Sequence, residues 1–338
     1  MDVVVPAPLV LARRPLVRVV APSLSARVVP AEVRAAATRR LTGLGFRVTF
    51  GEHVDADGPL RTAPIESRLA DLHAAFADPE VDLILTAIGG HSSNAVLGGL
   101  DWDLVAANPT WFCGFSDITA LQNALLTRAG LVTLSGPHWS TFGCRRHLES
   151  TVESFLDAVT SDGPVRWRAQ SWWSDDPTWY LNQEDRTRLP SEGWWTLFPG
   201  TAEGRIVGGN LCTLALLHGT GLLPDLAGAV LFVEDDAGSS AATVARHLHA
   251  LLRQPGADQV AGLVLGRFQR ETGMTRPLLA AIVAELPHLA GRPVVANVDF
   301  GHTFPMQTFP IGGAARVSAD ATDADITWEL PHSPVRTT

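Results

Sequence analysis

The sequence predicts an α/β fold: an N-terminal domain, built on a parallel sheet of the Rossmann type, precedes a smaller C-terminal domain rich in β-structure. Three features of the 338-residue chain indicate this fold. Apolar runs alternate with helix-like repeats from residue 16 to residue 159, the alternation returns after residue 204, and a stretch without clear periodicity separates the two halves. A hydrophobic content of 46% is enough to fill two cores.

The first half alternates strands with helices. The helix expected at Pro64–Ala77 repeats its apolar residues on one face, whereas the strand expected at Val81–Ile88 is apolar along nearly its whole length. A strand of that kind is typical of a parallel sheet covered on both faces. The other elements expected here are strands at Leu16–Ala21, Phe46–Phe50 and Leu131–Leu134 and helices at Pro30–Leu44 and His147–Val159. Such alternation predicts right-handed crossovers between parallel strands.

The stretch from residue 163 to residue 200 has no clear period and is rich in tryptophan. A long segment of this kind is either a functional loop or a linker, and its aromatic content argues against disorder. We therefore expect an N-terminal domain over residues 1–162, a connecting and substrate-binding loop over residues 163–200, and a C-terminal domain over residues 201–338. The loop holds six of the ten tryptophans, which are Trp167, Trp172, Trp173, Trp179, Trp194 and Trp195.

The second half returns to alternating elements and ends in β-structure. Its tail alternates apolar and polar residues between Ala314 and Leu330, as a half-buried strand does. The other elements expected are strands at Ala229–Val233, Val260–Leu265 and Pro293–Val298 and helices at Ala241–Leu252 and Pro277–Leu286.

Charge and cysteine content narrow the class of protein. The net charge of −9 and the absence of a basic cluster disfavour a nucleic-acid partner. No apolar run is long enough to cross a bilayer, and the N-terminus lacks the basic start and the cleavage site of a signal peptide. The three cysteines, Cys113, Cys144 and Cys212, are sparse and lack metal-ligand spacing. We expect a cytoplasmic protein without a membrane partner.

A serine follows an apolar run at Gly114-Phe115-Ser116-Asp117, and a helix-like pattern begins at once. A strand, a tight turn carrying an exposed serine, and a helix together form a nucleophile elbow. The helix N-terminus behind such a serine presents unpaired N–H groups that favour negative charge. The alternative is that Ser116 simply caps an ordinary helix.

Two more polar residues follow expected strands, which gives the order Ser116, Glu234, His302. Nucleophile, acid and base in this order are known in acyl-transfer triads. A neutral serine needs a histidine to take its proton, and the histidine needs a carboxylate to fix its tautomer. Against this, Glu234 is one of three consecutive acids that a solvated loop would also explain, and His302 would serve equally as a turn residue.

The turn at Gly89-Gly90 follows the apolar strand and offers backbone N–H groups that can approach a reacting oxygen closely. With the N–H of Asp117, these groups would form an oxyanion hole beside Ser116. His138, which follows Gly136-Pro137, is a rival to His302 as the base.

Several segments resemble the LD-carboxypeptidase family of serine peptidases, in the order that the family has them. The resemblance implies Ser116 as nucleophile, Glu234 and His302 as its partners, and Asp117 with Gly89-Gly90 as oxyanion donors. It also implies a site between the two domains, a homodimer, and no metal or other cofactor. The segments are Ala87–Asn94, Gly114–Leu121, Ser135–Pro137, Gly208–Leu211, Leu231–Asp235 and Phe300–Thr303.

Two branches of that family differ in substrate. One removes the terminal D-alanine from murein tetrapeptides, and the other confers immunity to microcin C by cleaving the amide between a peptidyl or aminoacyl group and a modified adenylate. The Ser-Ser-Asn after His91, the tryptophan-rich stretch and the Gly-Gly-Asn at residues 208–210 resemble the immunity branch. The branch pattern implies Trp179 for stacking on the base and Asn210 for a polar contact to the nucleotide. His91 and Phe115 depart from the family's usual aromatic and tyrosine residues.

Two further classes remain open from the residues alone. A non-catalytic protein that binds nucleotides or peptides would use the tryptophans as its ligand platform. An α/β-hydrolase esterase is disfavoured, because its elbow motif has glycine two residues after the serine, where this chain has Ile118.

Overall fold

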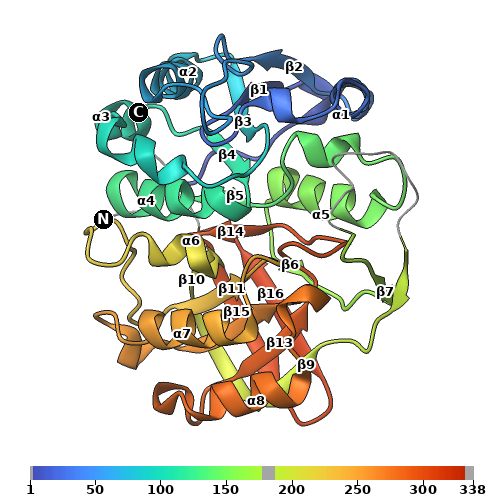
Figure 1. Ribbon diagram of the computed structural model, residues 1–338, viewed down its shortest axis with the longest axis vertical. Coiled ribbons are helices and arrows are strands. Elements are labelled where there is room, and N and C mark those ends of the chain that lie inside the picture. Colours follow the sequence, from blue (N-terminus) through green and yellow to red (C-terminus); the bar gives the residue numbers. More distant parts are fainter. Residues whose placement is uncertain (1–2, 177–186, 332–338) are drawn as a thin grey trace.

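The computed structural model describes residues 3–176 and 187–331, and its N-terminal region is an α/β sheet. The strands here are β1 (Leu16–Val20), β2 (Arg47–Phe50), β3 (Val81–Thr86), β4 (Trp111–Gly114), β5 (Thr133–Ser135) and β14 (Phe309–Ile311). They lie in the order β14-β5-β4-β3-β1-β2 (Figure 1). All neighbours are parallel except β14, which runs antiparallel to β5. The predicted parallel sheet is confirmed.

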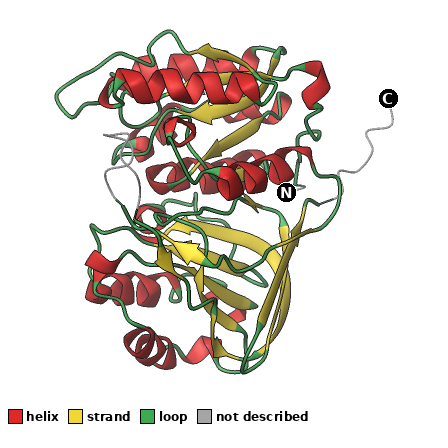
Figure 2. Cartoon of the chain, turned by 90° about the vertical axis from the view of Figure 1, so that its right-hand side faces the viewer, coloured by secondary structure: helices red, strands yellow, loops and turns green. Residues whose placement is uncertain are grey.

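Helices cover both faces of this sheet (Figure 2). The helices are α1 (Ala31–Gly43), α2 (Ile65–Ala77), α3 (Trp102–Ala107), α4 (Thr119–Ala129) and α5 (Glu149–Thr160). Ile84 of β3 packs with α2 and α4 on one face, whereas Leu83 and Leu85 pack with α1 and α5 on the other. Positions that are buried on both faces of a sheet favour apolar residues, which explains the run Leu83–Leu85 in β3, whereas Asp82 is exposed.

The C-terminal region is rich in β-structure, as predicted, and contains an eight-stranded mixed sheet. Its strands are β6 (Val165–Arg166), β9 (Trp195–Phe198), β10 (Gly200–Asn210), β11 (Val230–Glu234), β12 (Gly262–Gly266), β13 (Val294–Val298), β15 (Ala314–Ala319) and β16 (Ala324–Glu329). They lie in the order β6-β16-β15-β10-β11-β12-β13-β9, with β10 to β13 parallel. The helices of this region are α6 (Leu211–Ala215), α7 (Ala241–Leu251) and α8 (Arg276–Ala284).

The tryptophan-rich stretch contributes strands at both of its ends. β6 pairs with β16 and β9 pairs with β13, so each end of the stretch extends the large sheet. Between them, β7 (Trp172–Trp173) and β8 (Leu189–Pro190) form a separate two-stranded ribbon. The boundaries at residues 162 and 200 stay a prediction.

The two regions join through strand pairing and buried hydrogen bonds. β14 comes from the C-terminal half of the chain but completes the N-terminal sheet, and Figure 1 shows it lying between the two regions. Asn123 of α4 donates to the carbonyl of Gly208 at 2.8 Å, and the N–H of Asn210 donates to Thr119 Oγ1 at 2.8 Å. The start of α4 therefore lies against the end of β10. No helix within the described ranges is long and apolar enough to cross a membrane.

Candidate active site

Ser116 lies at the tight turn between β4 and α4, where the sequence predicts it. Its φ angle is 61°, in the left-handed region that side chains other than glycine rarely adopt. The turn is crowded, because a Cβ at Gly114 would collide with the hydroxyl of Thr86. Strain of this kind persists where the surrounding structure fixes it, and it clusters at functional sites.

The structure brings the three residues of the predicted triad together. His302 Nε2 lies 3.0 Å from Ser116 Oγ, and His302 Nδ1 lies 2.7 Å from Glu234 Oε2. Glu234, the last residue of β11, is 2% exposed, and the loop after β13 carries His302. The carboxylate therefore contacts one ring nitrogen while the other faces the hydroxyl, as proton transfer from a serine requires.

Asn210 lies behind this chain of hydrogen bonds and is 1% exposed. Its side-chain oxygen caps α6 by accepting from the Thr213 N–H at 3.0 Å. Its amide nitrogen donates to Glu234 Oε1 at 3.4 Å and to Asp235 Oδ1 at 3.3 Å. Asn210 thus supports the carboxylate that contacts His302, and its predicted contact with a nucleotide stays a prediction.

The three consecutive acids, Glu234, Asp235 and Asp236, give this site a strongly negative environment. Burial by itself lowers the pKa of His302, but the hydrogen-bonded carboxylate of Glu234, followed by Asp236 and Asp235, raises it to about 9. Burial, with the charges of Glu234 and Asp236, raises the pKa of Asp235 to about 7. The imidazolium form of His302 is therefore favoured at neutral pH in the free protein.

The Gly89-Gly90 turn lies directly beside the serine. A Cβ at Gly89 would lie 3.2 Å from Ser116 Oγ, and a Cβ at Gly90, whose φ is +149°, would collide with the side chains of Ser23 and Leu24. Glycine at both positions therefore lets the backbone of this turn pass close to Ser116 on one side and to Ser23 and Leu24 on the other.

The Asp117 carboxylate holds the loop that follows this turn. It accepts hydrogen bonds from the N–H groups of Ser92 and Ser93 at 2.8 and 2.7 Å and from the hydroxyl of Ser23 at 2.5 Å. Asp117 is only 3% exposed, so these bonds are shielded from water. Its side chain therefore ties the loop after Gly90 to the elbow. Sequence reasoning missed Ser23, although its place directly after the first strand marks the same edge of the sheet.

A cavity of about 260 Å³ opens onto Ser116 and His302. His138, the rival base, lines it but makes its hydrogen-bond contact with Thr86 Oγ1, at 2.7 Å, instead of with Ser116. The other lining residues are Leu24, Ile88, Gly89, Gly90, Phe115, Ser140, Asp176 and Gln269.

The tryptophans described in the 163–200 stretch all make structural contacts. Trp167 is buried against Phe232, Phe300 and Phe309. Arginine guanidinium groups lie within 6 Å of the rings of three others, in the pairs Arg188–Trp172, Arg267–Trp173 and Arg276–Trp195. Trp179 lies outside the described residues, so its predicted stacking role stays a prediction.

A buried ion pair fixes this stretch to the loop that carries His302. Arg267 Nη1 lies 2.7 Å from Asp299 Oδ1, and both side chains are almost fully buried. The other oxygen of Asp299 accepts from the Trp194 indole N–H at 2.8 Å and from the Gln170 N–H at 3.0 Å. Asp299 lies three positions before His302, so it links both ends of the stretch to the loop that carries His302.

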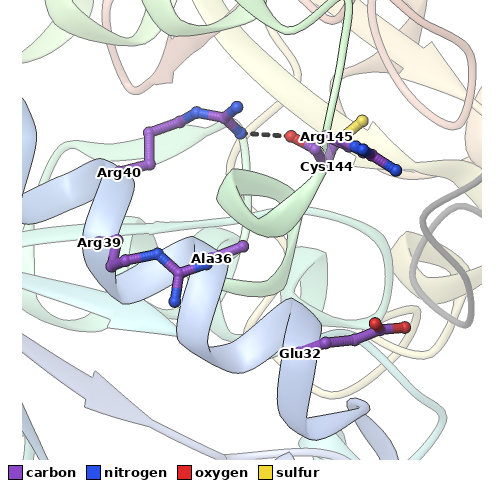
Figure 3. A pocket seen from close by; sticks show the side chains of 6 residues that line it. All are labelled: Glu32, Ala36, Arg39, Arg40, Cys144 and Arg145. Carbon is purple, nitrogen blue, oxygen red and sulfur yellow. Dashed lines mark hydrogen bonds between the residues drawn. The ribbon is translucent and has the colours of Figure 1, made fainter.

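A second cavity, of about 560 Å³, lies between α1 and the segment before α5 and contains no predicted site residue (Figure 3). Arg40 donates to the backbone carbonyl of Cys144 across it. The other lining side chains are Glu32, Ala36, Arg39 and Arg145. Among residues 3–176 and 187–331, no three histidine, cysteine or acidic side chains gather as a metal site.

A strained serine at the carboxyl edge of a parallel sheet, hydrogen-bonded to a histidine that contacts a carboxylate, is the arrangement of a serine hydrolase. Residues 17–136 match the family model of the LD-carboxypeptidase N-terminal domain, and residues 203–317 match that of the LD-carboxypeptidase C-terminal domain. The chain belongs to the LD-carboxypeptidase family and is a serine-type hydrolase, as predicted.

Individual relatives cover most of the chain. YocD of Bacillus subtilis (strain 168) is 42% identical over 90% of this chain and 93% of its own length. The microcin C7 self-immunity protein MccF of Escherichia coli is 31% identical over 84% of each chain. The murein tetrapeptide carboxypeptidase of Pseudomonas aeruginosa is 29% identical over 86% of this chain and 90% of its own.

Solved structures share the fold along nearly the whole length. The MccF-like protein of Bacillus anthracis str. Ames has a TM-score of 0.94 and 43% identity, covering 97% of this chain and 100% of its own. MccF in complex with glutamyl sulfamoyl guanosine has a TM-score of 0.85 and 27% identity, covering 97% and 99%. The predicted resemblance to this family and its MccF branch is confirmed.

Proposed function

We propose that Ser116 is the nucleophile of an amide hydrolase, with His302 as general base and acid and Glu234 as the partner of His302. The observation that carries this proposal is the hydrogen-bonded chain from Ser116 Oγ through both nitrogens of His302 to the buried Glu234 carboxylate. The strained elbow that presents Ser116 supports the same assignment.

In the proposed reaction, neutral His302 takes the Ser116 proton as Oγ attacks the substrate carbonyl. The oxyanion that forms accepts hydrogen bonds from the N–H groups of Asp117 and the Gly89-Gly90 turn. His302 then protonates the leaving amine and activates the water that releases the acyl group. Glu234 stabilises the imidazolium at both steps.

For the substrate, we propose peptidyl- or aminoacyl-nucleotide amides of the microcin C type, so that the enzyme detoxifies such antibiotics. Similarity to MccF supports this, because MccF is the microcin C7 self-immunity protein and binds glutamyl sulfamoyl guanosine. The Asp299 anchor also supports it, since it holds the tryptophan-rich stretch next to the His302 loop. Trp179 and Asn210 remain the proposed nucleotide contacts. We further propose that the protein is a cytoplasmic homodimer. Light scattering would measure the mass of the dimer in solution directly.

The second candidate is a murein tetrapeptide carboxypeptidase that releases terminal D-alanine. It is favoured by the family model and by the likeness to the Pseudomonas aeruginosa enzyme of that activity. The two candidates share the proposed triad and differ in the groups on either side of the scissile amide.

The deciding experiment offers aspartyl sulfamoyl adenosine and murein tetrapeptide separately to the purified enzyme and to Ser116→Ala. We expect the nucleotide amide to have the higher kcat/KM and Ser116→Ala to hydrolyse neither. A higher kcat/KM for release of D-alanine would establish the second candidate. Saturable ligand binding with no turnover and no labelling by a fluorophosphonate would instead indicate a binding protein.

A further inference from the structure

Arg68 is a buried arginine that the proposed reaction does not use. It lies near the start of α2, and its side chain is only 5% exposed. Arginine is almost never fully buried in a protein unless its charge and its N–H groups have partners. The partners of Arg68 therefore indicate what this residue does.

The Nη1 atom of Arg68 joins two segments that lie far apart in the sequence. It donates to the carbonyl of Pro22, just after β1, and to the carbonyl of Ser92, in the loop after Gly90, at 2.9 Å each. A longer contact, of 3.3 Å, reaches the Ser92 hydroxyl. The guanidinium thus connects the loop after Gly90 to the segment after the first strand.

Ser92 is held from both sides. Its N–H donates to the Asp117 carboxylate at 2.8 Å, and its carbonyl accepts from Arg68 at 2.9 Å. Both charged side chains are almost fully buried, and hydrogen bonds to charged groups are about twice as strong as neutral ones. Ser92 comes two residues after Gly90, which belongs to the turn of the proposed oxyanion donors. The position of that turn therefore depends on a residue fixed by two opposite charges.

The segment after β1 also contacts the turn directly. The Leu24 N–H donates to the carbonyl of Gly89 at 3.2 Å, and a Cβ at Gly90 would collide with the hydroxyl of Ser23. The turn thus lies against this segment, while Arg68 binds both the segment and the loop that follows the turn. Without Arg68, the two would lose the charged link between them.

The charge of Arg68 matters as well as its hydrogen bonds. Burial lowers the pKa of Arg68, and the negative charge of Asp117 acts in the opposite direction. An arginine side chain stays protonated in proteins, so a positive charge is present here at any working pH. This charge offsets the carboxylate of Asp117, whose own N–H is a proposed oxyanion donor. A buried carboxylate without that compensation would oppose the negative charge that develops at the oxyanion.

We propose that Arg68 is the positioning residue of the proposed oxyanion hole. It holds the Gly89-Gly90 turn in place through Ser92, and its charge offsets that of Asp117. Arg68 is not among the residues that line the cavity of Ser116, so it acts on the reaction through the turn. Its contribution should therefore appear in the transition state and not in substrate binding. The inference rests on the function proposed above.

The kinetic test compares Arg68→Met with Arg18→Met, using whichever of the two substrates the wild-type enzyme turns over. Arg18 is the matched control, because it is a partly buried arginine whose partners are Asp78 and Thr49. We expect Arg68→Met to lower kcat about 100-fold with KM within about threefold, as misplacement of a catalytic group by about 1 Å does. Arg18→Met should lose stability but keep its kcat. An equal loss of kcat in both variants, or a raised KM at unchanged kcat in Arg68→Met, would overturn the proposal.

Labelling by a fluorophosphonate gives a second readout, which remains valid if Arg68→Met folds poorly. Phosphonylation of Ser116 uses the same N–H groups, because the phosphonyl oxygen occupies the position of the oxyanion. Arg68→Lys keeps the buried charge and should retain the fold, but its ammonium ends one covalent bond short of the position of Nη1. We expect its labelling to be about 10-fold slower than that of the wild type.

The outcomes of the labelling experiment separate the two proposals. A wild-type labelling rate in Arg68→Lys would show that the turn is held without the hydrogen bonds of Arg68, and it would contradict the positioning role alone. Absence of both labelling and turnover in the wild type would instead overturn the proposed function.

Discussion

The Asp236 carboxylate lies 4.0 Å from Nε2 of His302, the ring nitrogen that contacts Ser116. Glu234 occupies the opposite edge of the ring, so the imidazole lies between two acidic side chains. Both favour the charged form of His302, whereas attack by Ser116 requires the neutral form. Glu234 and Asp236 therefore set the pH range in which His302 is neutral and can act as the proposed base.

We expect kcat/KM to rise with pH through the pKa of His302, which is about 9, and to level off above it. Asp236→Asn removes one of the charges that raise this pKa, so the rise should move to lower pH by about one unit. Profiles of kcat/KM against pH for the wild type and the variant measure the shift. Asp162→Asn, an exposed acid outside the site, is the control. Coincident profiles for wild type and Asp236→Asn would contradict the assignment of His302 as the base.

Ser116 is the proposed nucleophile and also has a strained backbone conformation. Two substitutions separate the loss of the nucleophile from the effect of the strain. Ser116→Ala and Ser116→Gly should both lower kcat by about 10⁴-fold or more, because neither retains a nucleophile. At a φ of 61°, glycine avoids the steric cost that alanine keeps. Ser116→Gly should therefore be more stable than Ser116→Ala by about 1 kcal/mol in urea unfolding. Equal stability of the two variants would mean that the turn is not strained in solution.

The sequence was sufficient to mark the candidate residues one by one. Ser116 and Glu234 each come at or just after the carboxyl end of a parallel strand, and an apolar run followed by a polar residue marks that position locally. The two strands, β4 and β11, belong to different sheets, so their meeting does not follow from this pattern and was implied only by the family resemblance. His302 was found in the same way, since it follows the strand expected at Pro293–Val298.

Other features of the site have no local signal. β14 is only three residues long and pairs with β5, far away in the sequence, so no periodicity marks it. The hydrogen bond between Ser23 and Asp117 joins residues 94 positions apart. The contact between His138 Nδ1 and Thr86 Oγ1, at 2.7 Å, joins residues 52 positions apart, and neither residue type nor spacing fixes such a distance. Tertiary contacts of this kind require coordinates.

The anchoring role of Asp117 predicts a combined loss of stability and rate. Asp117→Ala leaves the buried N–H groups of Ser92 and Ser93 without their acceptor, which should cost about 3 kcal/mol in urea unfolding. Release of the loop after Gly90 should also lower kcat at least 10-fold. Asp117→Asn keeps an acceptor oxygen and should lose less of both. Wild-type kcat in Asp117→Ala would show that the loop is held by other contacts.

The buried ion pair of Arg267 and Asp299 predicts that removing one partner alone strongly destabilises the protein. Arg267→Met leaves the Asp299 carboxylate buried without its partner, which should cost about 3–5 kcal/mol in urea unfolding. The double variant Arg267→Met with Asp299→Asn removes the unpaired charge and should recover part of that cost. If the two variants are equally unstable, the loss comes from the packing of Arg267 on Trp173 instead.

Asp235 predicts a pH dependence of stability with a definite sign. Its folded-state pKa of about 7 lies above the ordinary value of 3.8, so between these values the folded protein holds a proton that the unfolded chain releases. The stability associated with this proton is fully present below about pH 4 and is lost as the pH rises through about 7. Asp235→Asn has no such proton to lose, so this part of its stability does not fall as the pH rises. The variant also retains a side-chain oxygen that can accept from the Asn210 amide. The variant should therefore gain on the order of 4 kcal/mol over the wild type between pH 4 and pH 8 in urea unfolding. A constant difference across that range would show that Asp235 is ionised in the folded protein.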